Sequence, residues 1–144
     1  MKLKPHETWE IQRVIRAYLE DPAILRGLTL DLVSLARRFD ALPVSADMGG
    51  ALLIRPSGEV ILVHSNQPWG LESEHEVVTD PGWRTIAFVE AGERFPSLSF
   101  LRPERPDTAV DCPSCGGTGR VPFADQKVMC GACHALGWVG PIGR

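Results

Sequence analysis

Apolar positions at helical spacing predict two helices in the first third of the chain. In residues 8–20, five side chains follow the i, i+3, i+4, i+7, i+8 pattern of one buried helix face: Ile11, Val14, Ile15, Tyr18 and Leu19. A second helix is predicted to start after an N-cap at Thr29 and to stop at Leu42-Pro43. Its apolar stripe consists of Leu32, Leu35, Ala36 and Phe39. The break between the two helices falls at Asp21-Pro22 and Gly27.

The middle of the chain changes to short apolar runs bounded by turn residues. Ala51–Ile54 and Glu59–His64 flank the segment Arg55-Pro56-Ser57-Gly58. Proline at the second turn position and glycine at the fourth favour a type I turn, so the two runs predict a β-hairpin. Residues 65–79 show no sustained periodicity and predict a loop.

Residues 81–95 are compatible with a helix or a strand. Thr85–Val89 has strand propensity, but Asp80-Pro81 is a strong N-cap and first-turn pair, and Pro96 is a stop signal. These signals favour a helix. The stiff, polar segment 102–107 that follows predicts a boundary between a body of residues 1–107 and a tail of residues 108–144.

Composition and charge limit the class of protein. The 144 residues are 44% hydrophobic and 23% charged, with a net charge of −3, as in an ordinary soluble domain. The longest apolar runs fall far short of the roughly 18 residues that a membrane span needs, and the start of the chain lacks the apolar run of a signal peptide. We therefore expect a cytoplasmic α+β protein with helices packed on a small antiparallel sheet.

The four cysteines are confined to the predicted tail, where they form two pairs with two residues inside each pair: Cys112, Cys115, Cys130 and Cys133. Two tight turns of this kind, joined by a hairpin, can aim four sulfur atoms at the tetrahedral corners that zinc prefers. Arg120–Phe123 and Lys127–Met129 supply the predicted hairpin strands. The spacing therefore predicts a zinc-ribbon-like hairpin that holds one structural zinc ion.

Other readings of the cysteines stay open. Two internal disulfides would need an oxidising compartment, which the absence of an export signal argues against. The Cys112–Cys115 pair alone also suggests a redox motif, although a redox centre does not require a second pair at ribbon spacing. His134 adjoins Cys133 and could compete as a ligand, but we expect it to be an exposed neighbour.

The two cysteine pairs carry a resemblance to a known family. Residues 112–119, with the pattern Cys-x-x-Cys-x-Gly-x-Gly, resemble one repeat of the DnaJ cysteine-rich domain, and residues 130–137 are similar but have Ala135 in place of a glycine. The resemblance covers about 26 residues and implies that paired repeats clamp one zinc ion. The chain lacks the His-Pro-Asp tripeptide of the partner-binding J domain, so the resemblance does not imply a chaperone role.

The body carries a second resemblance. Helices followed by Leu42-Pro43, Gly49-Gly50 and a hairpin with a turn at Gly58 resemble the SUKH superfamily of bacterial immunity proteins. This resemblance implies an immunity or toxin-antagonist role that depends on binding another protein.

Candidate partner-binding residues lie in and beside the predicted loop. Glu72, Glu74 and Glu76 could accept a basic partner or bind a metal, although a solvated acidic loop has the same composition. Trp69 is the best candidate for an exposed anchor. The other tryptophans are predicted to be core or half-buried, and they are Trp9, Trp83 and Trp138.

No established catalytic motif occurs in the sequence, and a zinc ion held by four thiolates leaves no position for substrate. The sequence therefore favours a zinc-binding protein-interaction module over an enzyme, with an unidentified protein partner. One alternative is a nucleic-acid-binding zinc ribbon that uses Arg120, Lys127 and Arg144, although three dispersed cations are a weak footprint. Another alternative is a thiol redox or chaperone-like protein.

Overall fold

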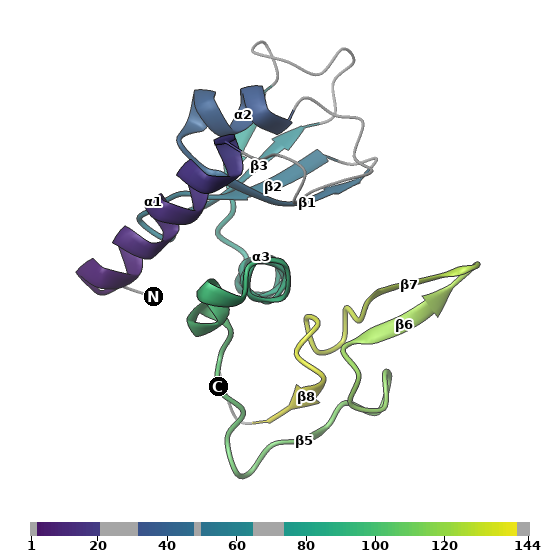
Figure 1. Cartoon of the computed structure of the whole chain (residues 1–144). Helices are drawn as coiled ribbons and strands as arrows, with labels where there is room; N and C mark the ends of the chain where they lie inside the picture. Colours follow the sequence, from purple (N-terminus) through teal and green to yellow (C-terminus); the bar gives the residue numbers. More distant parts are fainter. Residues whose placement is uncertain (1–2, 21–31, 48–49, 65–73, 141–144) are drawn as a thin grey trace.

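A computed structural model of the chain describes residues 3–20, 32–47, 50–64 and 74–140 (Figure 1). The body contains α1 (Pro5–Glu20), α2 (Leu32–Phe39), β1 (Leu42–Asp47), β2 (Gly50–Ile54), β3 (Val60–His64), β4 (His75–Val77), α3 (Pro81–Arg94) and the 3-10 helix η2 (Pro96–Leu101). The tail contains β5 (Val110–Asp111), β6 (Arg120–Phe123), β7 (Gln126–Met129) and β8 (Trp138–Val139). This combination confirms the predicted α+β class.

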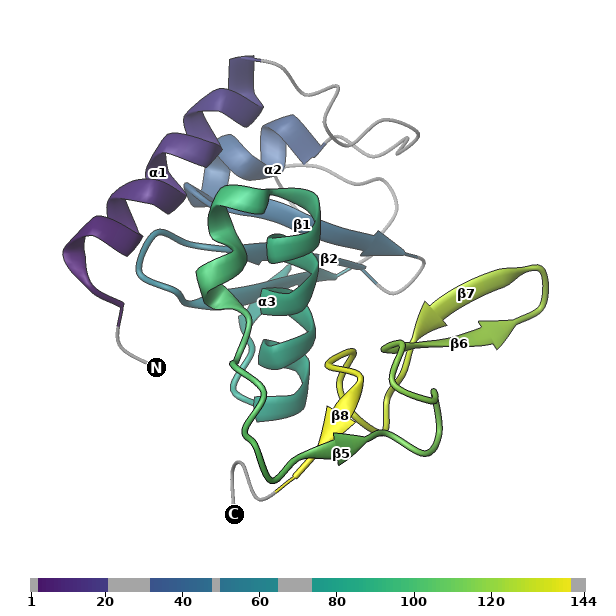
Figure 2. The ribbon, with the colours of Figure 1, turned by 60° about the horizontal axis from the view of Figure 1, so that its bottom comes forward.

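The body is built on a four-stranded antiparallel sheet with the strand order β1-β2-β3-β4. The predicted hairpin between β2 and β3 is confirmed, because the N–H of Gly58 donates to the carbonyl of Arg55 at 2.8 Å across the turn. Gly58 has a φ of +90°, which the chain needs to enter β3 after a type I turn. Figure 2 shows the sheet between α3 on one face and α1 and α2 on the other.

Apolar side chains from all three helices and from the sheet form the core of the body. Both faces of the sheet are covered over much of their area, as the nearly continuous apolar runs of β2 and β3 predict. The largest enclosed side chains include Ile11, Tyr18, Leu35, Leu42, Leu53, Ile54, Ile61, Leu98 and Leu101.

The ambiguous segment after residue 80 is a helix. The Asp80 carboxylate accepts a hydrogen bond of 2.9 Å from the N–H of Trp83, and Pro81 occupies the first turn. Helix α3 ends at Arg94, one residue before Phe95, and Pro96 then starts η2. The capping signals therefore outweighed the strand propensity of Thr85–Val89.

Two strands of the body are absent from the sequence prediction. Helix α2 ends at Phe39, before Asp40 with a φ of +48°, and Leu42-Pro43 instead begins β1, in which Leu42 lies opposite Ile54. A proline is tolerated in β1 because β1 is an edge strand. Residues 65–79 were predicted as a loop, yet His75–Val77 forms β4. All three β4 residues are exposed, so no apolar alternation marked the strand, and backbone pairing with β3 decides its conformation.

The two predicted N-terminal helices are both present. Helix α1 starts at Pro5, before the predicted residue 8, because the Glu7 carboxylate accepts from the N–H of Lys4 at 2.8 Å and satisfies the first turn. Helix α2 has the predicted apolar stripe. The proposed N-cap at Thr29 lies outside the described residues.

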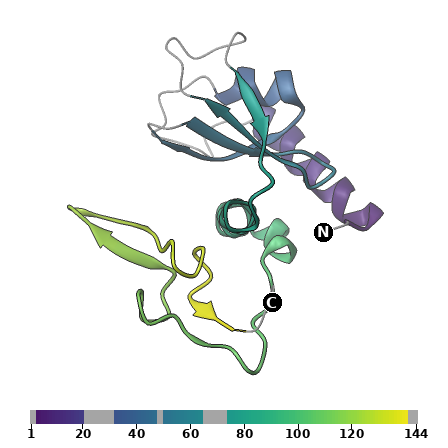
Figure 3. The same ribbon diagram turned by 180° about the vertical axis from the view of Figure 1, so that it is seen from behind.

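The tail contains the predicted hairpin and one strand pair that the sequence did not reveal. Strands β6 and β7 pair antiparallel, with Phe123 opposite Gln126 and Val121 opposite Val128. Strand β5 also pairs with β8, which closes the two ends of the tail onto each other. In Figures 1 and 3, α3 lies between the sheet and the tail.

Two of the three tryptophans that the sequence predicts to be core or half-buried are exposed. Trp138 is 5% exposed, as predicted, but Trp9 and Trp83 are 59% and 54% exposed. A core position is therefore wrong for these two residues. Trp9 lies on the outer side of α1, and Trp83 lies in the first turn of α3, where the helix leaves the sheet partly uncovered.

Candidate metal centre

The four cysteines converge on one point in the tail. Cys112 follows β5, Cys130 follows β7, and the second member of each pair lies in the turn that comes next. Their four Sγ atoms all lie within 4.8 Å of one another. Within the described residues, this is the one group of three or more potential ligands close enough to hold a metal ion, and such a group could hold one ion.

The sulfur separations are those of free thiols around a shared centre. The Sγ atoms of Cys112 and Cys130 are 3.8 Å apart, and those of Cys115 and Cys133 are 3.7 Å apart. A disulfide bond is about 2.05 Å long, and all four cysteines are free thiols in this structure. Cys115 is partly exposed, whereas the other three cysteines are buried.

The two cysteine turns are related by an approximate twofold repeat in their hydrogen bonds. The N–H of Gly119 donates to Sγ of Cys115, and the N–H of Gly137 donates to Sγ of Cys133, both at 3.2 Å. Each turn also holds the other. The N–H of Cys112 donates to the carbonyl of Gly137 at 3.0 Å, and the N–H of Cys130 donates to the carbonyl of Gly119 at 2.9 Å. Each glycine therefore supports a sulfur in its own turn and anchors the opposite turn.

Gly119 and Gly137 are required by the close approach of the two turns. Gly119 has a φ of +78°, and a Cβ added there would lie 2.5 Å from the carbonyl oxygen of Ala135. Gly137 has a φ of +87°, and its added Cβ would lie 2.6 Å from the carbonyl oxygen of Gly117. Ala135, which replaces a glycine of the repeat, adopts a φ of +66° and is buried.

Three glycines of the tail allow strain and contact to be separated. Gly116→Ala introduces only an unfavourable φ of +67°, because nothing lies within 4 Å of the added Cβ. We expect this variant to weaken metal affinity about tenfold, since a left-handed non-glycine residue costs about 1–2 kcal/mol. Gly119→Ala adds the backbone contact and should weaken affinity much further. Chelator competition measures both.

Gly131→Ala is the matched control, because Gly131 is exposed and nothing lies within 4 Å of its added Cβ. Its metal affinity should equal that of the unmodified chain. Equal affinities for all three variants would contradict the requirement for glycine at position 119.

Burial and hydrogen bonding act on the thiols in opposite directions. Burial by itself raises the pKa of Cys115, but the N–H groups of Gly119 and Gly117 stabilise the thiolate and lower its pKa to about 6. Burial raises the pKa of Cys133 to about 12, despite the hydrogen bond from Gly137. A divalent cation deprotonates coordinating thiols and offsets the repulsion between neighbouring thiolates. All four cysteines are therefore expected to be deprotonated together only when a cation is bound between them.

An ion-pair network connects the cysteine turns to α3. Glu90 is only 6% exposed, and its carboxylate pairs with Arg94 at 3.2 Å and with Arg120 at 3.3 Å. Arg120 also pairs with Glu93 and follows Gly119 directly in the sequence. The Arg120 side chain, a candidate nucleic-acid contact, is thus engaged with α3 in the structure.

Apolar and polar contacts complete the docking of the tail. Val89 of α3 is fully buried in a cluster with Ala135, Leu136 and Trp138. Arg102 donates to the carbonyl of Leu136 at 2.9 Å. Helix α3 therefore packs one side into the body core and another against the tail.

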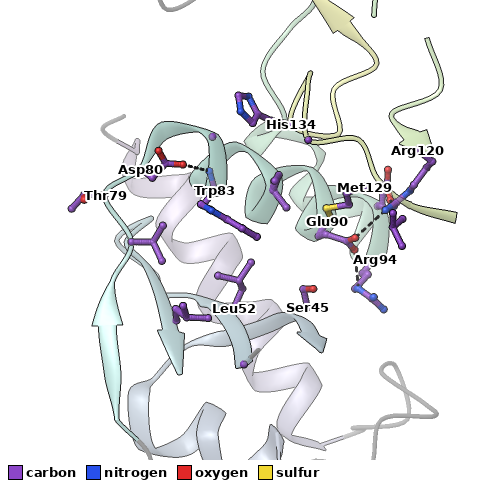
Figure 4. Close-up of a pocket in the computed structure, with 18 of the residues that line it drawn as sticks. Ser45, Leu52, Thr79, Asp80, Trp83, Glu90, Arg94, Arg120, Met129 and His134 are labelled. Atoms are coloured by element: carbon purple, nitrogen blue, oxygen red, sulfur yellow. Dashed lines mark hydrogen bonds and ion pairs between the residues drawn. The ribbon is translucent and has the colours of Figure 1, made fainter. Parts of the chain in front are cut away.

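A cleft of about 1250 Å³ lies between the sheet, α3 and the tail (Figure 4). Its sheet side includes the cross-strand row Ser45, Leu52, Leu62 and Glu76. Trp83, Ile86 and Glu90 line it from α3, and Lys127, Val128 and Met129 line it from β7. The cleft therefore has its complete shape only when the tail is folded against α3.

The predicted partner-binding residues have different outcomes. Trp69 and Glu72 lie outside the described residues. Glu74 is exposed, and Glu76 is exposed on β4, where its carboxylate lies 3.5 Å from Nε2 of His64 and lines the cleft. His134 is exposed as expected and is not part of the cysteine cluster, and an added Cβ at Gly82 would lie 2.5 Å from its Nε2.

Sequence reasoning did not identify Trp83 or Glu90 as site residues. Glu90 sits four residues before Arg94 on α3, a spacing that suggests a surface ion pair rather than a buried one. Its second partner, Arg120, is 30 residues away in the sequence, and no local pattern predicts that contact.

Comparisons with models of protein families, with curated proteins and with solved structures found no match to this chain. None of the described helices is long and apolar enough to cross a membrane.

Proposed function

We propose that this chain is a protein-interaction module whose tail is held in shape by one structural zinc ion. The observation that carries the proposal is the convergence of four Sγ atoms within 4.8 Å. Zinc–sulfur bonds of about 2.3 Å place tetrahedral sulfur atoms about 3.8 Å apart. The pairs at 3.8 and 3.7 Å match this separation.

The chemistry of the donors supports zinc and a structural role. Thiolates are soft ligands that favour zinc or iron over magnesium and calcium, and four of them form the closed site of a structural zinc. The N–H groups of Gly119 and Gly137 give the ligating sulfurs the outer hydrogen bonds that orient such ligands. When bound, the ion supplies four bonds that join the turn after β5 to the turn after β7.

The interaction role is supported by the cleft that the folded tail helps to form. Its residues form one side of the cleft, so metal binding and the shape of a candidate binding surface are coupled. The engagement of Arg120 with Glu90 and Glu93 leaves less free positive charge for phosphate, which weighs against the nucleic-acid alternative. An immunity or toxin-antagonist role in bacteria is a specific version of this proposal, supported by the resemblance of the body to the SUKH superfamily.

The proposal is tested first by metal content. Protein purified under reducing conditions should contain about one zinc per chain, because a closed four-thiolate site holds one ion. Elemental analysis measures the content, and a thiol-modifying reagent should release the ion in step with four reacted thiols. Four fast-reacting thiols in a metal-free chain that keeps the folded tail would contradict the structural-zinc proposal, and iron in place of zinc would contradict the identity of the metal.

A further inference from the structure

The cleft exists because α3 covers only part of the sheet. Ile54 and Val60 lie opposite each other on β2 and β3, and both are fully buried. The next cross-strand pair on the same face of the sheet, Leu52 with Leu62, borders the cleft. Along this second row the sheet ends at Glu76 of β4, whose side chain is 59% exposed. An apolar floor thus leads to a carboxylate at the sheet edge.

The first turn of α3 places an aromatic ring beside a second carboxylate. Trp83 is 54% exposed although it lines the cleft, and Figure 4 shows Asp80 next to it. The Asp80 carboxylate accepts from the backbone N–H of Trp83, a neutral donor that leaves its negative charge in place. Glu76 contacts His64, which neutralises it only when the imidazole is protonated. An exposed indole and two carboxylates therefore line the cleft, and Asp80 is the carboxylate beside Trp83.

The charges at the other end of α3 are balanced internally. Glu90 and Glu93 pair with Arg94 and Arg120, and Lys127 of β7 adds one positive charge. Glu90 lies ten positions after Asp80 along α3, which corresponds to about 15 Å. The cleft is therefore acidic and aromatic near Trp83, and balanced to slightly basic near the tail hairpin.

From this charge pattern we infer that the cleft binds an extended, basic segment of a partner protein, with a lysine or arginine over Trp83 and beside Asp80. A cation over an indole face gains an attraction that carboxylates at its side reinforce. The floor formed by Leu52, Leu62 and Ile86 accepts the apolar neighbours of that residue. The volume of about 1250 Å³ exceeds the roughly 300–1000 Å³ of small-ligand sites, which favours a polypeptide segment.

This inference rests on the proposed interaction function and names the chemistry of its partner. The test uses the full zinc-loaded chain and a phage-displayed library of random nonapeptides. Bound peptides should be enriched in lysine or arginine flanked by apolar residues. Enrichment of acidic residues, or no enrichment, would overturn the inference, while a correct zinc content in the same preparation would leave the metal proposal intact.

Variants then locate the binding site with the best selected peptide, measured by fluorescence anisotropy. Trp83→Ala should weaken binding at least tenfold, whereas Trp9→Ala, which removes an equally exposed indole outside the cleft, should leave it unchanged. Asp80→Asn together with Glu76→Gln should weaken binding about tenfold and flatten its salt dependence. Asparagine caps a helix as well as aspartate does, so α3 stays intact.

Two results would contradict the assigned surface or partner class. Equal losses for Trp83→Ala and Trp9→Ala would show that binding is not located in the cleft. Tighter binding of a single-stranded oligonucleotide than of the selected peptide, with competition between them, would assign the cleft to nucleic acid instead.

Discussion

Replacement of Cys115 by serine should unfold the tail while the body keeps its structure. A serine hydroxyl does not ionise near neutral pH, so the site would keep only three strong ligands. Structural zinc binding in finger peptides corresponds to about 10–16 kcal/mol of folding free energy, so the loss of one ligand removes a large share of what holds the tail. The cysteines and the few apolar residues around them form a cluster too small to replace it.

Zinc content and amide hydrogen exchange over residues 108–140 measure this effect. Amides that donate inside the cysteine turns, such as those of Gly119 and Cys130, should lose their protection. Ser114→Ala is the matched control, because Ser114 is exposed in the same turn, between the two ligands of its pair. A tail that stays protected in Cys115→Ser and loses only thiol reactivity would favour the redox alternative over structural zinc.

Truncation after Asp107 should leave a folded body that is less stable than the full chain. The core of the body lies entirely within residues that the truncation keeps. The cost comes from Val89, which the tail buries completely, and exposing such a side chain costs about 1.5–3 kcal/mol. Glu90 would regain water and keep Arg94 as a partner, so its loss of Arg120 adds little. Urea denaturation followed by circular dichroism measures the difference.

A second substitution tests whether that cost arises at the docking surface. Val89→Ala in the full chain should lower the free energy of unfolding by about 1.5 kcal/mol, because it removes two buried methylene equivalents at about 0.8 kcal/mol each. In the truncated chain the same change should have almost no effect, because Val89 would already be exposed. A wholly unfolded truncated chain would show that the boundary between residues 107 and 108 is wrong and that the tail belongs to one cooperative core.

The accuracy of the sequence prediction differed between elements for a physical reason. Helices α1, α2 and α3 and the hairpin of β2 and β3 were predicted because apolar spacing, caps and turn residues act within a few positions. Strands β1 and β4 were missed because pairing with a neighbouring strand decides them. β1 begins at a Leu-Pro pair that suggests a helix stop, and β4 is short and exposed throughout, with the sequence His-Glu-Val.

Burial of the aromatic side chains could not be derived from their local sequence. Trp83 and Trp138 each follow a glycine in the sequence, yet one is 54% exposed and the other 5% exposed. The difference arises because Trp138 meets Val89 across the docking surface, whereas Trp83 borders a cleft that no described segment fills. Partners distant in sequence, and not residue type, determined these exposures.

The sequence by itself determined the cysteine cluster, since two Cys-x-x-Cys turns with their glycines and a short hairpin between them suffice to bring four sulfur atoms together. Only the tertiary structure decided where that cluster acts. The contact of Arg120 with Glu90 and the burial of Val89 place the tail against α3, and the uncovered strip of sheet beside Trp83 then becomes a cleft. Short-range geometry is encoded in adjacent residues, whereas docking depends on complementary surfaces that form only after both parts have folded.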